Sequence, residues 1–294
     1  MRKFFQELLD FFRKGDMVLL ALCLLTTIFG VVILSSVTNY SNTYRYLIVQ
    51  LAATVMGVFL YAVISSIDLD LIMEYRLPLV IFNVVFLMLL IPFGVDYDSG
   101  NRSWLDIPGL PFDIQVAEIL KTTYILITAS VMAAHQNRLS KFRSVMHMVF
   151  HLGLLVGLNM VLSKDAGVSL IFVFIFIGMT FAGGVHKGWF IAAISCLAAG
   201  FPVLWSILRP HQKNRFLVLF DPSVDPTATG IRWHSNQAML SLTGGGFTGQ
   251  GLYSGRRTSV GALHAQHTDY IFSAIGEELG FIGCMAIILL EFAI

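Results

Sequence analysis

The sequence has little charge and little cysteine. Only 13% of its 294 residues are charged, against about 25% in a typical soluble domain, whereas 56% are hydrophobic. With a mean hydropathy of +0.76, this composition excludes an ordinary soluble domain and indicates an integral membrane protein. The formal net charge is only +1 and no polybasic tail is present, so the sequence offers nothing that would attract nucleic acid, and no nucleic-acid partner is expected.

Cysteine and histidine give only weak signals for metal or disulfide chemistry. The three cysteines all lie within apolar runs and are interpreted as small buried hydrophobic side chains: Cys23, Cys196 and Cys284. His147 and His151 are four residues apart, without an evident third ligand, and buried hydrogen-bonded imidazoles are the expected interpretation. His264, His267 and Asp269 have a spacing that a divalent metal could use.

Eight apolar stretches are long enough, at roughly 20 residues each, to cross about 30 Å of hydrocarbon. They occupy residues 17–37, 46–67, 77–93, 116–134, 145–162, 166–185, 189–208 and 270–294. Since a bilayer offers no water to pair with backbone groups, these stretches should be helices. The first is about a full span with no small-residue cleavage site after it, so it is expected to be retained. The sequence predicts an all-α, polytopic membrane helix bundle.

Lysine and arginine are unevenly distributed between the connecting segments. With a cytoplasmic N-terminus, nine of them fall on the inner side and three in the short outer loops. The positive-inside rule favours this orientation, and seven crossings then place residues 209–269 on the outer face. The inner set is Arg2, Lys3, Arg13, Lys14, Arg76, Arg138, Lys141, Arg143 and Lys187.

The 209–269 segment is too long to be an idle connection. Its aromatic residues oppose disorder, so re-entrant or interfacial pieces folded over the bundle are expected. It includes a glycine-rich run at residues 244–251. No Lys-Ser or Lys-Thr follows this run and no strand precedes it, which excludes a nucleotide-phosphate cradle. Close approach of the backbone to a lipid headgroup or to neighbouring helices explains the glycines better.

Asp269 lies where this polar segment meets the last apolar run. With Thr268 beside it, Asp269 is suited to cap that helix. At the membrane surface, a partly desolvated acid would have a raised pKa and could accept a proton from a sugar hydroxyl. The two roles are compatible and both stay open. Glu277 and Glu278 follow; if they lie at the interface, the span from Leu279 onwards has only 16 residues.

Further ionisable residues are predicted on the same outer side. Glu118 and Lys121 are one helical turn apart, Arg102 lies in the preceding loop, and Asp165 lies between the fifth and sixth spans. They are interpreted as lining one outer polar pocket, with a purely structural ion pair as the alternative for Glu118 and Lys121. Four cations of the long segment could hold phosphates, or could form a solvated loop face: Arg209, Lys213, Arg215 and Arg232.

The order of these motifs resembles the SEDS family (shape, elongation, division and sporulation), whose members include FtsW, RodA and SpoVE. The resemblance covers essentially the whole chain. Upstream it rests on Gly100-Asn101-Arg102-Ser103-Trp104, on Gln115, Glu118 and Lys121, and on Asp165 and Gly167. Downstream it rests on Asp221-Pro222, Gln237-Ala238, Gly245-Gly246, Gly249-Gln250-Gly251, His267-Thr268-Asp269-Tyr270-Ile271-Phe272 and Gly276-Glu277-Glu278-Leu279-Gly280.

The resemblance implies a peptidoglycan glycosyltransferase that polymerises lipid II into glycan strands during elongation, division or sporulation. It implies a single membrane domain over residues 1–294, with about eight of ten spans present and the C-terminal end missing. Asp269 matches the catalytic carboxylate. The substrate-binding residues implied are Arg102, Glu118, Lys121, Asp165, Arg215, Gln237, His267 and Thr268. The implied setting is the outer face of the bacterial cytoplasmic membrane.

The resemblance also implies partners. These are lipid II and undecaprenyl-pyrophosphate-linked glycan, membrane lipids and a class B penicillin-binding protein. A divalent cation, Mg²⁺ or Mn²⁺, or basic residues would offset the charge of the leaving pyrophosphate. Two other functions stay open: a transporter (flippase) of lipid-linked precursors, for which no pair of interrupted helices is evident, and a non-catalytic scaffold of the cell-wall machinery.

Overall fold

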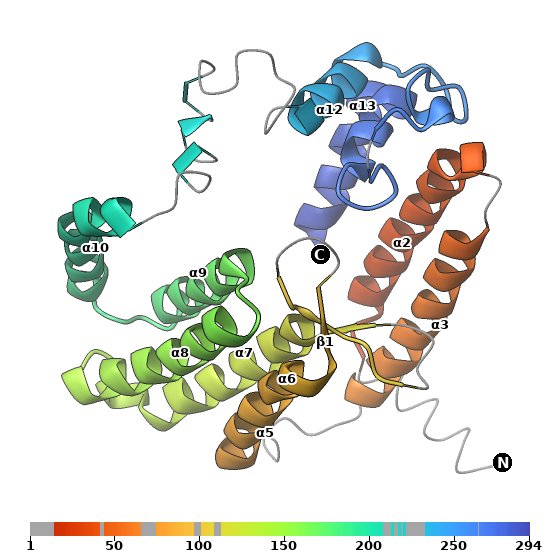
Figure 1. Ribbon diagram of the computed structural model, residues 1–294. Coiled ribbons are helices and arrows are strands. Elements are labelled where there is room, and N and C mark those ends of the chain that lie inside the picture. The colour runs from red at the N-terminus through yellow and green to blue at the C-terminus, as the bar shows by residue number, and fades with distance from the viewer. Residues whose placement is uncertain are drawn as a thin grey trace, which may run out of the picture. The chain divides into compact units, whose positions relative to one another are not determined.

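The computed structural model describes residues 15–41, 44–65, 75–96, 101–108, 113–207, 213–214, 217–218, 220–221, 233–263 and 265–294. These residues are mostly helical and belong to two compact units. Unit 1 combines Met1–Ile67 with Trp205–Ile294, and unit 2 is Asp68–Leu204. Figure 1 labels the elements of both.

Within its described residues, unit 1 contains four long helices and two short 3₁₀ turns. The Asp16 side chain caps the first helix by accepting bonds from the amides of Val18 and Leu19, both at 3.0 Å. The elements are α2 (Met17–Val37), η1 (Asn39–Ser41), α3 (Arg45–Ser65), α12 (Trp233–Gly244), η4 (Thr258–Val260) and α13 (Ile271–Ala293). Its apolar core joins Ile33, Leu34 and Val37 of α2 to Ala274, Ile275 and Cys284 of α13.

Unit 2 is a helical bundle with a small sheet at one end. Its helices are α5 (Arg76–Met88), α6 (Leu90–Phe93), α7 (Val116–Ala134), α8 (Phe142–Leu162) and α9 (Ala166–Ala182), with the turn η2 (Gln136–Arg138) and the start of α10 (Lys187–Ile207). Pro92 has no amide hydrogen to offer the preceding turn, which is consistent with the interruption between α5 and α6. Tyr124 and Phe172, both fully buried, lie at the centre of the core and meet edge to face at 5.6 Å between ring centroids.

The sheet consists of three two-residue strands that sequence periodicity did not predict. They are β1 (Gly94–Val95), β2 (Trp104–Leu105) and β3 (Ile114–Gln115), paired antiparallel in the order β1-β2-β3. Trp104 pairs with Gln115, the residue immediately before α7. This pairing fixes the loop that carries Arg102 next to the first turn of α7.

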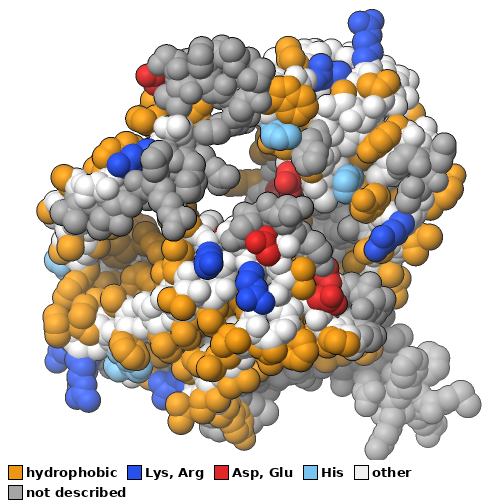
Figure 2. Space-filling model, in the orientation of Figure 1, with side chains coloured by type: hydrophobic (Ala, Val, Ile, Leu, Met, Phe, Trp, Pro, Cys, Tyr) orange, Lys and Arg blue, Asp and Glu red, His pale blue; other side chains and the backbone are white. Residues whose placement is uncertain are grey.

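The membrane fold predicted from hydropathy is confirmed. Among the described residues, six helices are long and apolar enough to cross a membrane, and two shorter apolar helical segments are Ala166–Ala182 and the Lys187–Pro202 part of α10. The 166–185 stretch is therefore shorter than the full span that was predicted. Large apolar side chains are exposed on the helices, and orange hydrophobic atoms cover much of the described surface in Figure 2. Lipid tails are the environment that such surfaces require. The single-domain assignment stays a prediction.

Candidate active site

Asp269 lies in unit 1, in a turn that ends where α13 begins. The predicted capping role is wrong, because the N-cap residue of α13 is Tyr270 and no side chain caps the helix. Asp269 is exposed, so the described residues do not provide the partial shielding from water that was expected. Its carboxylate has no hydrogen-bond or ion-pair partner among the described residues, which leaves both oxygens able to accept a proton.

The residues before Asp269 anchor this turn. Gln266 is only 1% exposed, and its side-chain amide donates to the carbonyl oxygens of Val37 at 2.6 Å and Thr258 at 3.0 Å. His267 is half-buried and lies against the ring of Tyr46 in α3, with 4.2 Å between centroids. Thr268 is exposed, and its hydroxyl donates to the carbonyl of Ala265 at 3.3 Å. The turn is therefore fixed from both α2 and α3.

Helix α13 is broken at Gly280, which has φ 66° and ψ −161°. The glycine-rich run packs against this break, and Figure 1 shows α12 beside α13. The amides of Gln250 and Gly251 donate to the carbonyls of Glu277 and Glu278, both at 2.9 Å. In return, the amides of Phe281 and Ile282 donate to the carbonyls of Gly246 and Phe247, at 3.0 and 3.3 Å. Backbone groups freed by the break are thus satisfied within the protein, as hydrocarbon requires.

The glycines permit this close approach, as predicted. A β-carbon on Gly245 would lie 1.8 Å from the carbonyl oxygen of Gly276, and one on Gly249 would lie 2.1 Å from that of Glu278. Gly249 also has φ 81°. Glycine is therefore required at these positions by the close contact with helix α13.

Two carboxyl groups are buried in the protein beside the break. Glu277 and Glu278 are each 1% exposed. Glu278 Oε1 accepts bonds from the hydroxyls of Ser36 at 2.7 Å and Thr258 at 3.0 Å, and Glu277 Oε1 accepts from the amide of Arg257 at 2.6 Å. Because Gln266 also binds Thr258, these bonds form a continuous path from α13 to the turn that carries Asp269.

The predicted substrate-binding residue Gln237 takes part in the same region. It lies on α12, and its side-chain oxygen accepts a hydrogen bond from the guanidinium of Arg257. The same guanidinium donates through Nε to the hydroxyl of Ser241 at 3.1 Å. Gln237 therefore orients Arg257 in the structure, and its contact with substrate stays a prediction.

Unit 2 brings the other described site residues to one end. Arg102 donates from its guanidinium to the carbonyl of Gly94 at 2.9 and 3.2 Å, while its amide donates to Ser163 at 3.0 Å. Asp165 accepts from the amide of Val168 at 3.1 Å, which caps α9, and from the hydroxyl of Ser103 at 3.0 Å. The loop around Arg102 is thereby tied to the start of α9.

Glu118 and Lys121 form the ion pair that their spacing predicts. The Lys121 ammonium lies 2.8 Å from both carboxylate oxygens of Glu118. The Glu118 side chain is 59% exposed and that of Lys121 is 23% exposed. Since β2 pairs with the residue before α7, this pair lies at the same end of unit 2 as Arg102 and Asp165.

Some predictions fall outside what the structure describes. Arg209, Arg215, Arg232 and His264 lie outside the described residues. Lys213 is described, and its ammonium lies 6.0 Å from the centre of the Trp205 ring. Within the described part of the chain, no group of three or more His, Cys, Asp or Glu could hold a metal ion, so no metal ligand is assigned.

Sequence reasoning gave no role to Gln266, Arg257, Ser36 or either glutamate of α13. Two acids inside an apolar run are costly in a membrane and therefore signal function or pairing. That signal was available in the sequence, but the partners of Glu278 were not. Ser36 is separated from it by 242 residues.

With this geometry in place, comparison with known proteins identifies the family. The sequence profile of the FtsW/RodA/SpoVE family, described as "Cell cycle protein", matches residues 16–294. A probable peptidoglycan glycosyltransferase FtsW from Trichlorobacter lovleyi is 31% identical over 281 residues, which are 93% of this chain and 72% of the relative. The chain belongs to the FtsW/RodA/SpoVE family. The predicted SEDS resemblance is therefore confirmed.

Further similarities support this assignment. A probable peptidoglycan glycosyltransferase FtsW from Geobacter sulfurreducens is 30% identical over 284 residues, covering 93% of this chain and 74% of its own. RodA from Thermus thermophilus has the same fold, with a TM-score of 0.62 at 20% identity over 95% of this chain and 72% of that one. A chain from a structure described as "Structural coordination of polymerization and crosslinking by a peptidoglycan synthase complex" gives a TM-score of 0.76 at 22% identity, covering 95% and 75%. The protein is a multi-pass membrane protein of this family.

Proposed function

We propose that this protein is a membrane glycosyltransferase that polymerises lipid II into peptidoglycan glycan strands, with Asp269 as the general base. Relatives at about 30% identity carry the name peptidoglycan glycosyltransferase. The observation that carries the assignment of the base is the exposed Asp269 carboxylate at the start of a membrane helix, in a turn anchored by the buried Gln266.

In the proposed reaction, the Asp269 carboxylate accepts the proton of the acceptor sugar's 4-hydroxyl as that oxygen attacks the anomeric carbon of the donor. The bond between this carbon and the pyrophosphate oxygen breaks, and the undecaprenyl pyrophosphate leaves with the electron pair. The proton rests on Asp269 until it passes to water. A positioned general base of this kind contributes about 10²- to 10⁴-fold to rate.

The remaining site residues would hold the substrate. Arg102, Lys121 and Arg215 supply positive charge for the pyrophosphate. Polar groups for the sugars would come from Glu118, Asp165, Gln237, His267 and Thr268. A divalent cation, Mg²⁺ or Mn²⁺, stays a prediction, and the described residues offer no cluster of ligands for it.

The location and the partner are part of the proposal. The excess of Lys and Arg in alternate connecting segments supports a cytoplasmic N-terminus and an active site on the outer face of the bacterial cytoplasmic membrane. A class B penicillin-binding protein is the proposed partner. It is supported by the family membership and by the fold shared with a chain of a peptidoglycan synthase complex.

The test is Asp269→Asn in the full protein together with its partner, with glycan strands formed from fluorescent lipid II separated by electrophoresis. We expect strand formation to fall by about 10²- to 10⁴-fold, because asparagine keeps the shape but cannot take the proton. Asp16→Asn is the matched control, because Asp16 is another exposed aspartate and lies at the start of α2, whereas the turn of Asp269 is bound to Val37 at the end of that helix. Unchanged strand yield in Asp269→Asn would remove the assignment of the base.

A transporter is the second candidate, because one observation favours it. Broken membrane helices surround substrate sites in many transporters, and α13 is interrupted at Gly280. A pair of interrupted helices in matching halves of the chain is not evident from the sequence. Reconstitution in liposomes separates the two functions: transfer of the lipid II headgroup across the bilayer without chain growth supports transport, and chain growth without transfer supports the glycosyltransferase.

A further inference from the structure

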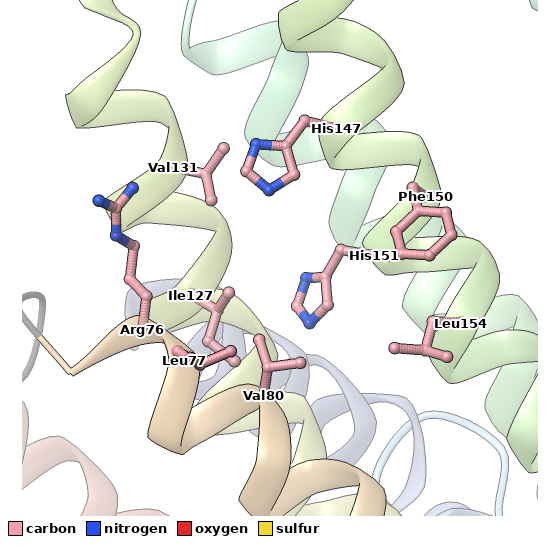
Figure 3. Close-up of a pocket in the computed structure, with 9 residues that line it drawn as sticks. All are labelled: Arg76, Leu77, Val80, Ile127, Val131, His147, Phe150, His151 and Leu154. Carbon is pink, nitrogen blue, oxygen red and sulfur yellow. The ribbon is translucent and has the colours of Figure 1, made fainter.

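Unit 2 contains a cavity of about 470 Å³ between α5, α7 and α8, far from the predicted substrate-binding end. Figure 3 shows its lining, with the imidazoles of His147 and His151 projecting from α8 toward the facing helices. Most of the wall is apolar and consists of Leu77, Val80, Ile127, Val131, Phe150 and Leu154. Such a wall suits a hydrocarbon chain.

A second cavity of about 610 Å³ adjoins the first, since Arg76 and His147 line both. Its lining is strongly basic and adds Arg138, Lys141 and Arg143. The described residues that line it include no Asp or Glu. The cations converge on one space without a counter-ion from the lining, which is the charge arrangement that an anionic headgroup requires.

His151 is an independent sign of a ligand in the apolar cavity. Its side chain is 8% exposed, and its Nε2 atom has no hydrogen-bond partner among the described residues. One face of the ring lies near Tyr124, with 5.2 Å between centroids. A buried polar nitrogen is unfavourable unless a ligand or water supplies its partner, and His151 is one of the residues that line this cavity.

The two cavities and the proposed substrate-binding residues of unit 2 lie at opposite ends of α7. Glu118 lies in the first turn of α7, whereas Val131 lies in its last turn, and η2 with Arg138 follows. At 1.5 Å per residue, the 19 residues of α7 span roughly 28 Å, close to the thickness of the hydrocarbon. The basic cavity therefore lies at the membrane surface opposite to that of Glu118. The charge pattern predicts that the surface with the basic cavity is cytoplasmic.

We propose that the two cavities form one binding site for an anionic membrane phospholipid. The phosphate lies among Arg76, Arg138, Lys141 and Arg143, one acyl chain occupies the apolar cavity, and His151 donates to an ester oxygen between them. Membrane orientation alone accounts for cations at this end of the helices. It does not account for a chain-sized apolar cavity beside them or for the unpartnered nitrogen inside it.

The test is native mass spectrometry of the full protein, delipidated in detergent and titrated with phosphatidylglycerol. We expect one tightly bound lipid, with phosphatidylcholine at least tenfold weaker because its headgroup carries no net charge. Arg138 and Arg143 are both exposed, so the double variant Arg138→Ala/Arg143→Ala should keep the fold. Each cation near an anionic headgroup contributes about fivefold, so this variant should bind about 25-fold more weakly.

Lys187→Ala is the matched control, because Lys187 is an exposed cation predicted on the same membrane surface but lines neither cavity. Val131→Trp, which fills the apolar cavity, should weaken lipid binding at least tenfold with every cation intact. If Val131→Trp does not fold, His151→Leu tests the same cavity by removing the donor to the ester oxygen, and it should weaken binding several-fold.

Three results would overturn the proposal. The first is equal affinity in the double variant and in Lys187→Ala, which would show that the cations serve orientation only. The second is displacement of the lipid by millimolar inorganic phosphate, which would show a free-anion site. The third is an unchanged affinity in both Val131→Trp and His151→Leu, which would exclude the chain from the cavity.

Discussion

The break in α13 requires a glycine at position 280. Its backbone, with φ 66° and ψ −161°, occupies a region that is essentially restricted to glycine. A β-carbon at this position would lie 2.3 Å from the amide nitrogen of Gly249 and 2.6 Å from the carbonyl oxygen of Phe247. Both are backbone atoms, so no side chain can rotate away to make room. Gly280→Ala must therefore displace the glycine-rich run from the helix.

The loss of stability expected in Gly280→Ala has two contributions. Holding alanine in this conformation costs about 1 to 3 kcal/mol. Displacing the run also weakens the bonds from Phe281 to Gly246 and from Ile282 to Phe247, each contributing about 1 kcal/mol. The sum is about 3 to 5 kcal/mol of lost stability, which corresponds to a melting temperature lower by roughly 10 °C.

Thermal unfolding of the detergent-solubilised protein, followed by tryptophan fluorescence, measures this change. Gly30→Ala is the control in the same unit: Gly30 lies within α2, and a β-carbon added there would have no neighbouring atom within 4 Å. Alanine there should leave stability unchanged or raise it by up to about 1 kcal/mol. If the two variants melted at the same temperature, the account of the break would be wrong.

Three further predictions concern the polar contacts. Glu278→Ala leaves the buried hydroxyls of Ser36 and Thr258 without their acceptor and should cost about 2 to 4 kcal/mol in thermal melts, whereas Glu278→Gln keeps an acceptor and should cost less. Asp165→Ala removes the cap of α9 and should lower stability by about 0.5 to 2 kcal/mol, with Asp165→Asn close to wild type; equal losses would contradict the capping role. A double-mutant cycle on Glu118 and Lys121 should give a coupling of only about 0.2 to 1 kcal/mol that falls with added salt, because the carboxylate is exposed; a salt-independent coupling would contradict this.

Hydropathy predicted the helices well because a bilayer leaves the backbone few alternatives. The stretch 116–134 was predicted with the bounds that α7 has, Val116–Ala134. The ion pair of Glu118 with Lys121 could be predicted as well, because residues three apart on a helix are neighbours whatever the tertiary structure. These are features that short-range geometry decides.

The break at Gly280 could not be predicted in the same way. Glycine is tolerated in membrane helices, and its conformation here depends on contacts with residues 246–249, more than 30 positions upstream. The capping role given to Asp269 failed for a related reason. The turn is anchored through Gln266, so the chain enters α13 at Tyr270 and Asp269 is left exposed.

The position of Asp269 depends on polar groups that are buried within unit 1. A carboxyl group within an apolar helix is unfavourable unless it accepts hydrogen bonds. The donors to Glu277 and Glu278 are Ser36 of α2, Arg257 just before η4 and Thr258 of η4. Removing one partner from such a group leaves a buried polar atom unpaired, which costs more than the bond itself contributes. The loss of one contact is therefore expected to weaken the others. Because Gln266 joins this network through Thr258, the position of the turn that carries Asp269 depends on these contacts.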